Sequence, residues 1–407
     1  MNTNGSFICG CDQGFVLQSD SRSCKIISKS NRVLCLAMKI ICFFPVYSDE
    51  SGIRLMAASG GRLDWMSPTI GTYGRVYLGP DMRFITTFDV DNRTDTYFWT
   101  DLAANTIYSR HARTANYTKV KKYRQKKNNN NLFFLFLLKL ITSGISYVAG
   151  LAFDWISRNI YWTDYILEHV EVANMNGTYR RILFHENLTN PWSIAVDPRA
   201  GARFLFFTDW GSNPRIERSN LDGQQRTVLV HDGIQMPVGL TLDHIREEVY
   251  FTDHHLNFIE VISYSGQNRR KILGNSHFLH GPGSIALFEQ YLYWVDTNSN
   301  EIRRLNRFQH GFKAQQHERV LSRANVNQIR ISHQIYQPLG ERTKNKTTFT
   351  ISIFIRLEIN PCQQSRCSQL CLLSPASANG YTCACSTGFI LEPDQFTCSK
   401  GLSIREK

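Results

Sequence analysis

The chain has 407 residues, of which 42% are hydrophobic, so it is long enough for two or three domains and apolar enough for a globular core. Its formal net charge is +12, a balance that often indicates a nucleic-acid or membrane partner. Three stretches, 25–46, 119–140 and 341–358, together carry 13 net positive charges, so the rest of the chain is close to neutral and no nucleic-acid partner is indicated.

Residues 1–24 contain three cysteines and a Gly-Phe pair, in the order Cys9-x-Cys11, Gly14-Phe15 and Cys24. This order resembles the C-terminal half of an epidermal-growth-factor-like (EGF-like) module, and the resemblance implies a disulfide between Cys11 and Cys24. The acidic residues that a calcium site of such a module needs before its first cysteine are absent, and calcium takes six or more oxygen ligands. We therefore expect no cofactor in this chain, calcium being possible only in a longer parent protein.

A short aromatic motif recurs five times along the middle of the chain. Each copy has two aromatic residues, a β-branched residue and an aspartate, a pattern typical of a β-strand. The last three intervals between the motif aspartates are 45, 44 and 43 residues, and a period in the forties predicts propeller blades. The copies are Phe98-Trp99-Thr100-Asp101, Tyr161-Trp162-Thr163-Asp164, Phe206-Phe207-Thr208-Asp209, Tyr250-Phe251-Thr252-Asp253 and Tyr293-Trp294-Val295-Asp296.

Each repeat supplies further strands around its motif. Upstream lies a short apolar strand that ends at an aspartate, as in Gly150–Asp154, Ser193–Asp197 and Gly239–Asp243. Downstream lies an alternating strand closed by a glycine turn, and then another apolar run, as in Ile216–Arg218 and Thr227–Val230. About four strands per repeat make up a propeller blade.

These motifs resemble the YWTD (class B) repeats of the low-density-lipoprotein receptor family, and they are most similar to the repeats of its giant endocytic receptors. The resemblance implies an all-β fold, a six-bladed YWTD β-propeller over residues 50–338, flanked by small disulfide-rich EGF-like modules. Five motifs are clear, and the degenerate segment Asn327–His333 is expected to stand in for the sixth. We expect a strand near Arg54–Ser59 to complete the last blade and close the ring.

Three segments, 25–46, about 119–140 and 341–358, do not fit the repeat. The interval between the first two motif aspartates is 63 residues, and removal of residues 121–139 would restore the period. We interpret these segments as translated non-coding sequence; the alternative is genuine surface-loop insertion, which propellers tolerate. The apolar run 132–138 is too short to cross a bilayer, which takes about 20 residues, so we expect no direct membrane span.

Residues 360–399 contain six cysteines with the spacing C-x4-C-x3-C-x11-C-x-C-x12-C. No histidine lies at zinc-finger spacing, and so small a module needs cross-links that form in an oxidising compartment. The spacing alone leaves about 15 disulfide connectivities open. The module resembles an EGF-like domain, whose pairing implies Cys362–Cys371, Cys367–Cys383 and Cys385–Cys398. We expect it to dock on the propeller, although the segment 341–358 lengthens the link.

An extracytoplasmic chain can carry N-linked glycans at Asn-x-Ser/Thr sequons, which are best accepted in exposed turns. Asn176 lies in a glycine turn of this kind. The candidate glycosylation sites are Asn92, Asn116, Asn176 and Asn187.

The motif residues could serve either architecture or ligand binding. As architecture, the aromatic residues would fill the space between blades, each burying ~150–250 Å². The aspartates would then tie neighbouring blades by accepting hydrogen bonds, since a buried carboxylate must be paired. As a ligand platform, the aromatic rings would face solvent. We favour architecture, because a residue that recurs in every blade serves the shape that recurs, and we expect ligand contacts in loops that differ between blades.

No catalytic or metal centre is predicted. The sequence has no Gly-x-Ser-x-Gly, no His-Glu-x-x-His and no Gly-rich phosphate loop, so we expect that the chain is not an enzyme. The resemblance implies an extracellular segment of an endocytic cell-surface receptor that organises the ectodomain and assists ligand binding and acid-dependent release. Its partners would be protein ligands and neighbouring receptor modules, at the plasma membrane and in endosomes. The alternative is a propeller whose own face binds a protein, as in Wnt co-receptors or matrix adaptors.

His254 and His255 directly follow one motif, where a blade loop begins. Imidazole is the side chain that changes charge between the cell surface and an endosome. The two residues are candidate pH sensors, and the alternative is a pair of ordinary surface histidines in a variable loop.

Overall fold

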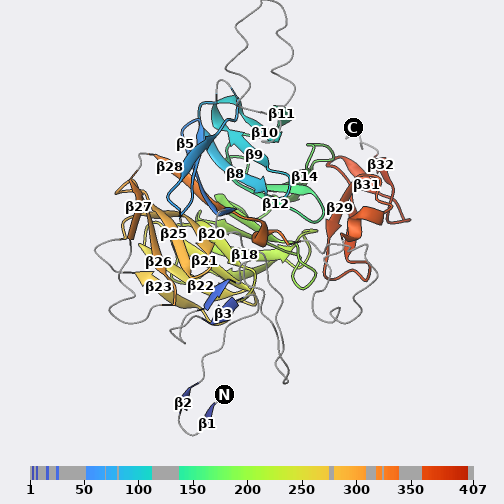
Figure 1. Cartoon of the computed structure of the whole chain (residues 1–407). Coiled ribbons are helices and arrows are strands. Elements are labelled where there is room, and N and C mark those ends of the chain that lie inside the picture. The colour runs from blue at the N-terminus through green and yellow to red at the C-terminus, as the bar shows by residue number, and fades with distance from the viewer. Residues whose placement is uncertain are drawn as a thin grey trace, which may run out of the picture.

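The computed structural model describes most of the region after residue 51 (Figure 1). The described ranges are 52–68, 70–79, 82–111, 137–274, 279–308, 318–322, 325–338 and 360–401, together with the short strands β1 (Asn2–Thr3), β2 (Ser6–Phe7), β3 (Phe15–Leu17) and β4 (Cys24–Ile26). The expectations for the Cys11–Cys24 disulfide, for Asn116, for the segment 341–358 and for nearly all of 25–46 fall outside these residues.

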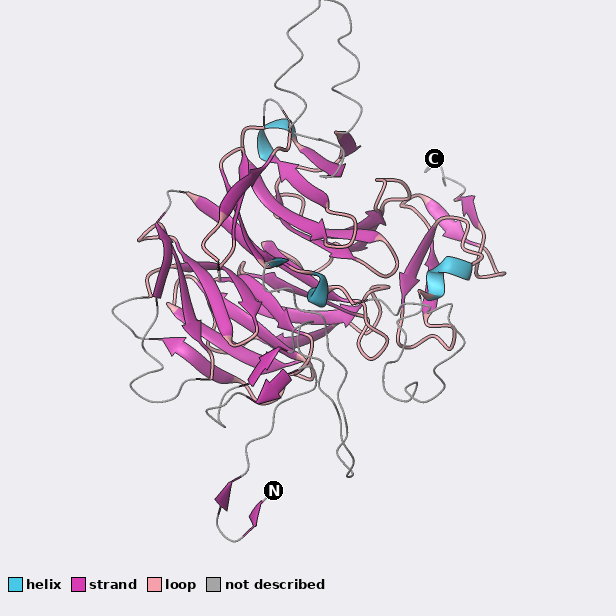
Figure 2. Cartoon of the chain, in the orientation of Figure 1, coloured by secondary structure: helices cyan, strands magenta, loops and turns pink. Residues whose placement is uncertain are grey.

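Six four-stranded antiparallel sheets form the body of the molecule, and we number them as blades 1 to 6 (Figures 1 and 2). The first three blades follow one another in sequence. Blade 1 is β8 (Ile85–Asp91), β9 (Thr96–Asp101), β10 (Thr106–His111) and β11 (Leu138–Ile141). Blade 2 is β12 (Val148–Asp154), β13 (Asn159–Asp164), β14 (His169–Asn174) and β15 (Arg181–Phe184). Blade 3 is β16 (Pro191–Asp197), β17 (Phe204–Asp209), β18 (Arg215–Asn220) and β19 (Thr227–Val230).

Blades 4 and 5 continue the series, and blade 6 combines the two ends of the propeller. Blade 4 is β20 (Pro237–Asp243), β21 (Glu248–Asp253), β22 (Phe258–Ser263) and β23 (Arg270–Gly274). Blade 5 is β24 (Pro282–Phe288), β25 (Tyr291–Asp296), β26 (Glu301–Asn306) and β27 (Glu318–Ser322). Blade 6 is β28 (Val326–Ser332), β5 (Arg54–Ser59), β6 (Arg62–Met66) and β7 (Tyr73–Val76). The predicted all-β, six-bladed propeller is confirmed.

Burial within a blade falls from the second strand to the outermost one. In blade 2, every residue of the motif strand β13 is buried, whereas the outer strand β15 has one buried residue in four. The motif strand is hydrogen-bonded on both edges and covered by neighbouring blades on both faces, so it is an apolar run rather than an alternating strand.

The ring closes through β28, which pairs with β5, and this confirms the expected role of Arg54–Ser59. One part of the prediction is wrong. The segment Asn327–His333 was expected to replace the sixth motif, but β28 is the first strand of its blade, and β5 occupies the motif position. Side chains of β28 reach blade 1, where Gln328 Oε1 accepts the Phe88 N–H at 2.7 Å and Asn327 Nδ2 donates to the Ile85 carbonyl at 2.9 Å. The seam between the last and first blades therefore combines these polar contacts with a buried apolar cluster, in which Met56 and Leu63 of blade 6 pack with Phe88 of blade 1.

The expected insertion at about 119–140 is also wrong at its C-terminal limit. Residues 138–141 form β11, which pairs with β10 and completes blade 1. The connection between these two strands runs over residues 112–137, whereas six residues join the corresponding strands of blades 2, 3 and 4. The surplus therefore lies before Leu138.

The C-terminal module comprises a short 3-10 turn, η7 (Pro361–Gln364), and the two hairpins β29 (Leu370–Leu373) with β30 (Tyr381–Ala384) and β31 (Phe389–Leu391) with β32 (Cys398–Lys400). Its disulfides are Cys362–Cys371, Cys367–Cys383 and Cys385–Cys398, the pairing that the EGF-like resemblance implies.

This module docks on blades 2 and 3, as expected. Leu370, Leu372 and Leu373 are fully buried in one apolar cluster, which also contains the motif residues Tyr161, Trp162 and Phe207 of those blades. The Thr387 N–H donates to the Arg180 carbonyl at 3.0 Å, and Asn159 Nδ2 donates to the Cys371 carbonyl at 2.8 Å. Apolar burial and backbone hydrogen bonds together fix the module to the propeller.

Candidate functional site

The motif aromatic residues lie in the interior of the propeller. All ten have exposed fractions of 0–1%: Phe98, Trp99, Tyr161, Trp162, Phe206, Phe207, Tyr250, Phe251, Tyr293 and Trp294. Rings at these positions pack between blades, as Phe98 does against Phe153, with 4.9 Å between ring centroids. The architectural interpretation is confirmed, and a ligand surface must be sought elsewhere.

The motif aspartates hold the segments that enter their blades. Asp164 accepts the N–H groups of Ser146 and Tyr147 at 2.6 and 3.1 Å, and those of Ile166 and Leu167 at 3.1 Å. The first two residues belong to the segment that leads from blade 1 into blade 2. Asp101, Asp209, Asp253 and Asp296 accept equivalent bonds, and all five are at most 2% exposed. Each buried carboxylate is thus satisfied by backbone donors, as predicted.

A second recurring feature was not predicted from the sequence. It is an ion pair between a glutamate and an arginine nine residues later. In blade 3, Arg226 Nε lies 2.5 Å from Glu217 Oε2, and Arg226 Nη1 donates to the Glu186 carbonyl at 2.9 Å. The guanidinium lies 5.6 Å from the ring centroid of the motif residue Phe207. Blades 2 and 4 repeat the arrangement with the pairs Glu171–Arg180 and Glu260–Arg269. The constant spacing of nine residues between glutamate and arginine could have revealed these pairs in the sequence.

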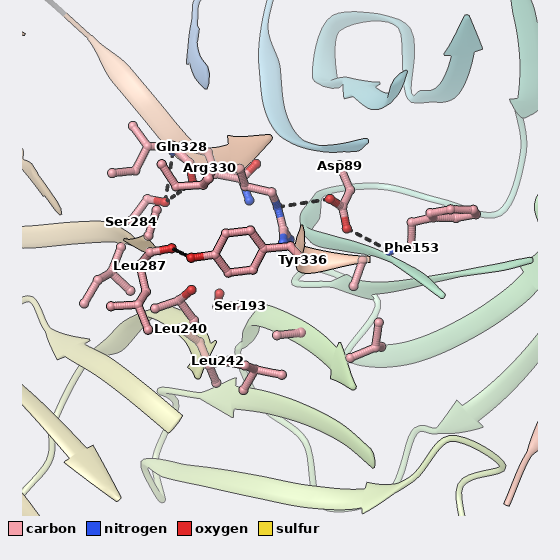
Figure 3. A pocket seen from close by; sticks show the side chains of 18 of the residues that line it. Asp89, Phe153, Ser193, Leu240, Leu242, Ser284, Leu287, Gln328, Arg330 and Tyr336 are labelled. Atoms are coloured by element: carbon pink, nitrogen blue, oxygen red, sulfur yellow. Dashed lines mark hydrogen bonds and ion pairs between the residues drawn. The ribbon is translucent and has the colours of Figure 1, made fainter. Parts of the chain in front are cut away.

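The first strands of the six blades surround a central cavity of about 100 Å³ (Figure 3). Arg330 of β28 donates to the carbonyls of Phe88 and Leu151 at 3.0 and 2.7 Å, and so bridges blades 1 and 2. Asp89 accepts the Phe153 N–H at 2.8 Å, and burial raises the pKa of Asp89 although Arg330 opposes the shift. Tyr336 lies across the cavity and donates to the Leu287 carbonyl. The remaining space suits a few water molecules rather than a ligand, since small-molecule sites measure about 300–1,000 Å³.

We call the end of the propeller that carries the motif aspartates the upper face. A cluster of four half-buried aromatic residues, Tyr147, Tyr165, Trp192 and Trp210, lies there between blades 2 and 3. Tyr165 stacks on Trp210 with 5.7 Å between centroids, and Trp192 meets the edge of Tyr165 at 5.6 Å. The contacts of the EGF-like module come from the opposite ends of these strands, so the aromatic cluster is left uncovered by it. This face has the composition of a protein-binding surface.

The candidate pH sensors lie on the same face. His255 is exposed, and half-buried His254 shares a hydrogen bond of 3.0 Å between its Nε2 and Thr297 Oγ1 of blade 5. Burial lowers the pKa of His254, an effect that Asp253 opposes and His255 reinforces. His254 therefore gains its charge only under acidic conditions, at the joint between two blades.

A third histidine, His244, was not predicted from the sequence. It lines the central cavity at the end opposite the upper face. His244 Nδ1 is 3.2 Å from Asp197 Oδ2, and Arg199 Nη2 is 2.6 Å from the same oxygen. Burial alone would raise the pKa of Asp197, but His244 and Arg199 outweigh it and hold this pKa below its usual range. Only the fold brings His244 and Asp197 together, since they lie in different blades.

The sequons differ in their surroundings. Asn92 is 7% exposed, its Oδ1 accepts a hydrogen bond from Ser332 Oγ at 2.7 Å, and its N–H donates to Gln337 Oε1. A glycan at Asn92 is incompatible with this packing, so the expectation for Asn92 is wrong. Asn176 and Asn187 are exposed.

Among the residues that the structure describes, no group of three or more His, Cys, Asp or Glu side chains could hold a metal ion. The same residues include no helix with both the length and the apolar character of a membrane-spanning segment.

Comparison with known proteins agrees with the repeat structure. Residues 158–198 and 203–244 match the family described as low-density lipoprotein receptor repeat class B. The chain is 26% identical over 404 residues to the Vitellogenin receptor Yl of Drosophila melanogaster, an alignment that covers 98% of this chain and 17% of that receptor. The chain thus spans less than a fifth of the length of this relative.

Solved structures show the same fold. A chain in the crystal structure of a nidogen/laminin complex is similar with a TM-score of 0.56 and 24% identity, over 69% of this chain and 99% of that one. TolB from Acinetobacter baumannii follows with a TM-score of 0.51 and 10% identity, over 70% of this chain and 68% of that one. The closed six-bladed ring, the recurrent motif with its buried aspartate and the class B match identify the chain as a propeller with low-density lipoprotein receptor class B repeats.

Proposed function

We propose that the chain is an extracellular propeller and EGF-like segment of an endocytic cell-surface receptor. In this role it organises the ectodomain, assists the binding of protein ligands, and promotes their release in acidic endosomes. The similarity to a vitellogenin receptor supports vitellogenin as a candidate ligand.

The docked C-terminal module is the observation that carries this proposal. Three buried leucines and several backbone hydrogen bonds fix it on blades 2 and 3, so propeller and module behave as one rigid unit. A rigid unit sets the direction in which neighbouring receptor modules leave it, whereas a flexible tether would not. This geometry suits an organising role better than that of an isolated binding domain.

Acid-dependent release is assigned to the upper face, where His254 bridges blades 4 and 5. Protonation places a charge on a half-buried ring beside Thr297 and next to His255. A ligand or a neighbouring module that lowers the pKa of His254 when it binds to this face would lose about 1.4 kcal/mol of binding free energy in acid for each unit of that shift.

The test replaces His254 and His255 with alanine in a receptor that contains this segment, and follows release of bound vitellogenin between neutral and mildly acidic pH. We expect release to shift toward lower pH. His231→Ala serves as the control, because His231 is an exposed histidine in a blade connection. A release curve that the double variant leaves unchanged would retire the assignment.

The aromatic cluster favours a second candidate function, in which the propeller face itself captures a protein ligand. Tyr165 and Trp192 offer rigid, partly exposed rings of the kind that dominate binding energy at interfaces. The discriminating test asks whether the purified propeller and EGF-like segment, without neighbouring modules, retains immobilised vitellogenin. Retention that Trp192→Ser abolishes and Phe308→Ser leaves intact would favour capture by this face, since Phe308 is exposed in blade 5 away from the cluster.

A further inference from the structure

A pocket of about 480 Å³ opens on the upper face of blade 3, beside the sequon Asn187-Leu188-Thr189. Asn187 itself is one of the residues that line it. We propose that this pocket holds the proximal N-acetylglucosamine residues of an N-linked glycan on Asn187. The proposal depends on the extracellular location in the proposed function, but it requires no ligand on the aromatic face.

The loop that carries Asn187 is fixed from both sides. Arg226 Nη1 donates to the carbonyl of Glu186, and Asp209 accepts the N–H groups of Thr189 and Asn190 at 3.3 and 2.7 Å. Between these anchors Leu188 is buried in the core, while Asn187 is exposed at a φ of 54°. A sugar attached there would leave the chain in one defined direction, along the wall of the pocket.

The lining suits a neutral amino sugar. Val228 is 44% exposed and supplies an apolar wall for a pyranose ring or an acetamido methyl group, while Ser212 and Asn213 supply exposed polar groups for its hydroxyls. The charged residues are paired, because Glu217 lies 2.5 Å from both Arg215 Nε and Arg226 Nε, and Asp209 Oδ2 lies 3.1 Å from Arg215 Nη2. The volume falls within the range of about 300–1,000 Å³ that small-molecule sites occupy.

The modification itself is a group transfer from a lipid-linked oligosaccharide diphosphate. The bond between Nδ2 of Asn187 and C1 of the first sugar forms, the bond between C1 and the diphosphate oxygen breaks, and Nδ2 gives up one proton. The lipid diphosphate leaves with the electron pair. Folding of blade 3 then brings Val228 and Asn213 against the attached sugar.

Asn176 is the matched control. It is exposed in a turn of blade 2, where its Oδ1 accepts hydrogen bonds from the N–H and the hydroxyl of Thr178 at 3.0 and 2.6 Å. It does not line the pocket beside Asn187. A glycan on Asn176 is expected to extend into solvent.

The experiment uses the whole chain secreted from glycosylating cells, with site occupancy read by mass spectrometry. Hydrogen exchange is then compared for the folded protein before and after endoglycosidase trimming to a single sugar or complete enzymatic removal of the glycan, and for Asn187→Gln, Asn176→Gln and Val228→Ser. We expect Asn187 to be occupied, and Asn187→Gln to accelerate exchange of residues 211–215 and 226–230 by about fivefold. Trimming to a single sugar should leave most of the protection of these two segments. Val228→Ser should remove part of this protection without changing the glycan occupancy of Asn187. Asn176→Gln should leave exchange in both segments unchanged.

Three results would overturn the proposal. They are an unoccupied Asn187, unchanged exchange in both Asn187→Gln and the fully deglycosylated protein, or equal effects of Asn176→Gln and Asn187→Gln. Complete enzymatic removal of the glycan acts on the folded glycoprotein and should accelerate exchange of both segments, so the comparison stands even if Asn187→Gln fails to fold. A glycan on Asn176 but none on Asn187 would overturn only the proposal that the pocket holds a glycan. The absence of a glycan from both residues would also count against the extracellular location.

Discussion

The motif aspartates show how one buried residue can fix the geometry of a whole blade. Asp164 is fully buried, and its partners are four backbone N–H groups rather than a cation. Two of the donors belong to the segment that enters the blade and two to the turn that follows the motif. The carboxylate therefore joins two separate chain segments at the upper face.

Replacement of Asp164 by alanine should lower the free energy of unfolding by roughly 3–5 kcal/mol, because it leaves buried backbone donors without partners. Urea denaturation of the two proteins measures the difference. Asp232→Ala is the control, since this side chain is 84% exposed, and its effect should stay within about 0.5 kcal/mol. Equal effects of the two substitutions would show that the motif aspartate has no special role.

Asp154 should make the propeller more stable in mild acid. Burial raises the pKa of Asp154 to about 6, against hydrogen bonds from Ser157 and Ile156 that lower it. The folded state therefore binds the proton before the unfolded state, whose value is 3.8, and stability rises as the pH falls through about 6 and levels off below about 4.

Asp154→Asn removes this contribution. The wild-type protein should gain on the order of 1 kcal/mol relative to Asp154→Asn between neutral pH and pH of about 5. Urea midpoints of both proteins at the two pH values provide the measurement. If the urea midpoints of both proteins change equally with pH, the pKa of Asp154 is not raised by folding and the prediction is wrong.

Single residues were predictable where they recur and unpredictable where only the fold joins them. The motif residues, such as Trp162 and Asp164, repeat with the blades, so their burial could be inferred. His244 and Asp197 lie in different blades and share no pattern, so their contact at 3.2 Å could not. Asn92 satisfied the sequon rule, but its burial depends on Ser332 and Gln337 from the other end of the propeller.

At the scale of elements, strand content followed from the alternating and apolar runs, while strand order at the seam did not. The segment Asn327–His333 was correctly expected to be a strand of the last blade, yet its position as first strand depends on β5, some 270 residues earlier in the chain. Similarly, β11 has no motif and follows a basic and apolar segment. Only its pairing with β10 shows that it is the fourth strand of blade 1.

The connection between β10 and β11 supplies a test of the insertion hypothesis. Replacement of residues 112–136 by a five-residue glycine-containing turn keeps Leu137, which packs against the core of blade 1, and gives the six-residue spacing of blades 2 to 4. We expect secretion and disulfide formation to be preserved. Deletion of 121–139 should be more harmful, because it removes Leu138 and Lys139 from β11.

Secretion titres and urea midpoints of the two variants compare them directly. If the shorter connection abolishes secretion or disrupts the disulfides of the C-terminal module, the segment is a structural part of the protein rather than an insertion.

At the scale of the whole molecule, ring closure and module docking create one body with two distinct faces. The lower side carries the EGF-like module on blades 2 and 3, while the upper face carries the aromatic cluster and His254. The central cavity of about 100 Å³ is crossed by Tyr336 and leaves little room for a ligand. The acid-dependent release that we propose therefore concerns the upper face.

The central claim is that this segment organises a receptor and promotes acid-dependent release, while most cargo contacts lie elsewhere. The most direct measurement compares vitellogenin binding and release by a receptor with and without residues 52–401, at neutral and mildly acidic pH. The account predicts that capture at neutral pH is largely retained and that acid release is lost in the shortened receptor. Loss of neutral capture, or acid release that continues unchanged, would contradict it.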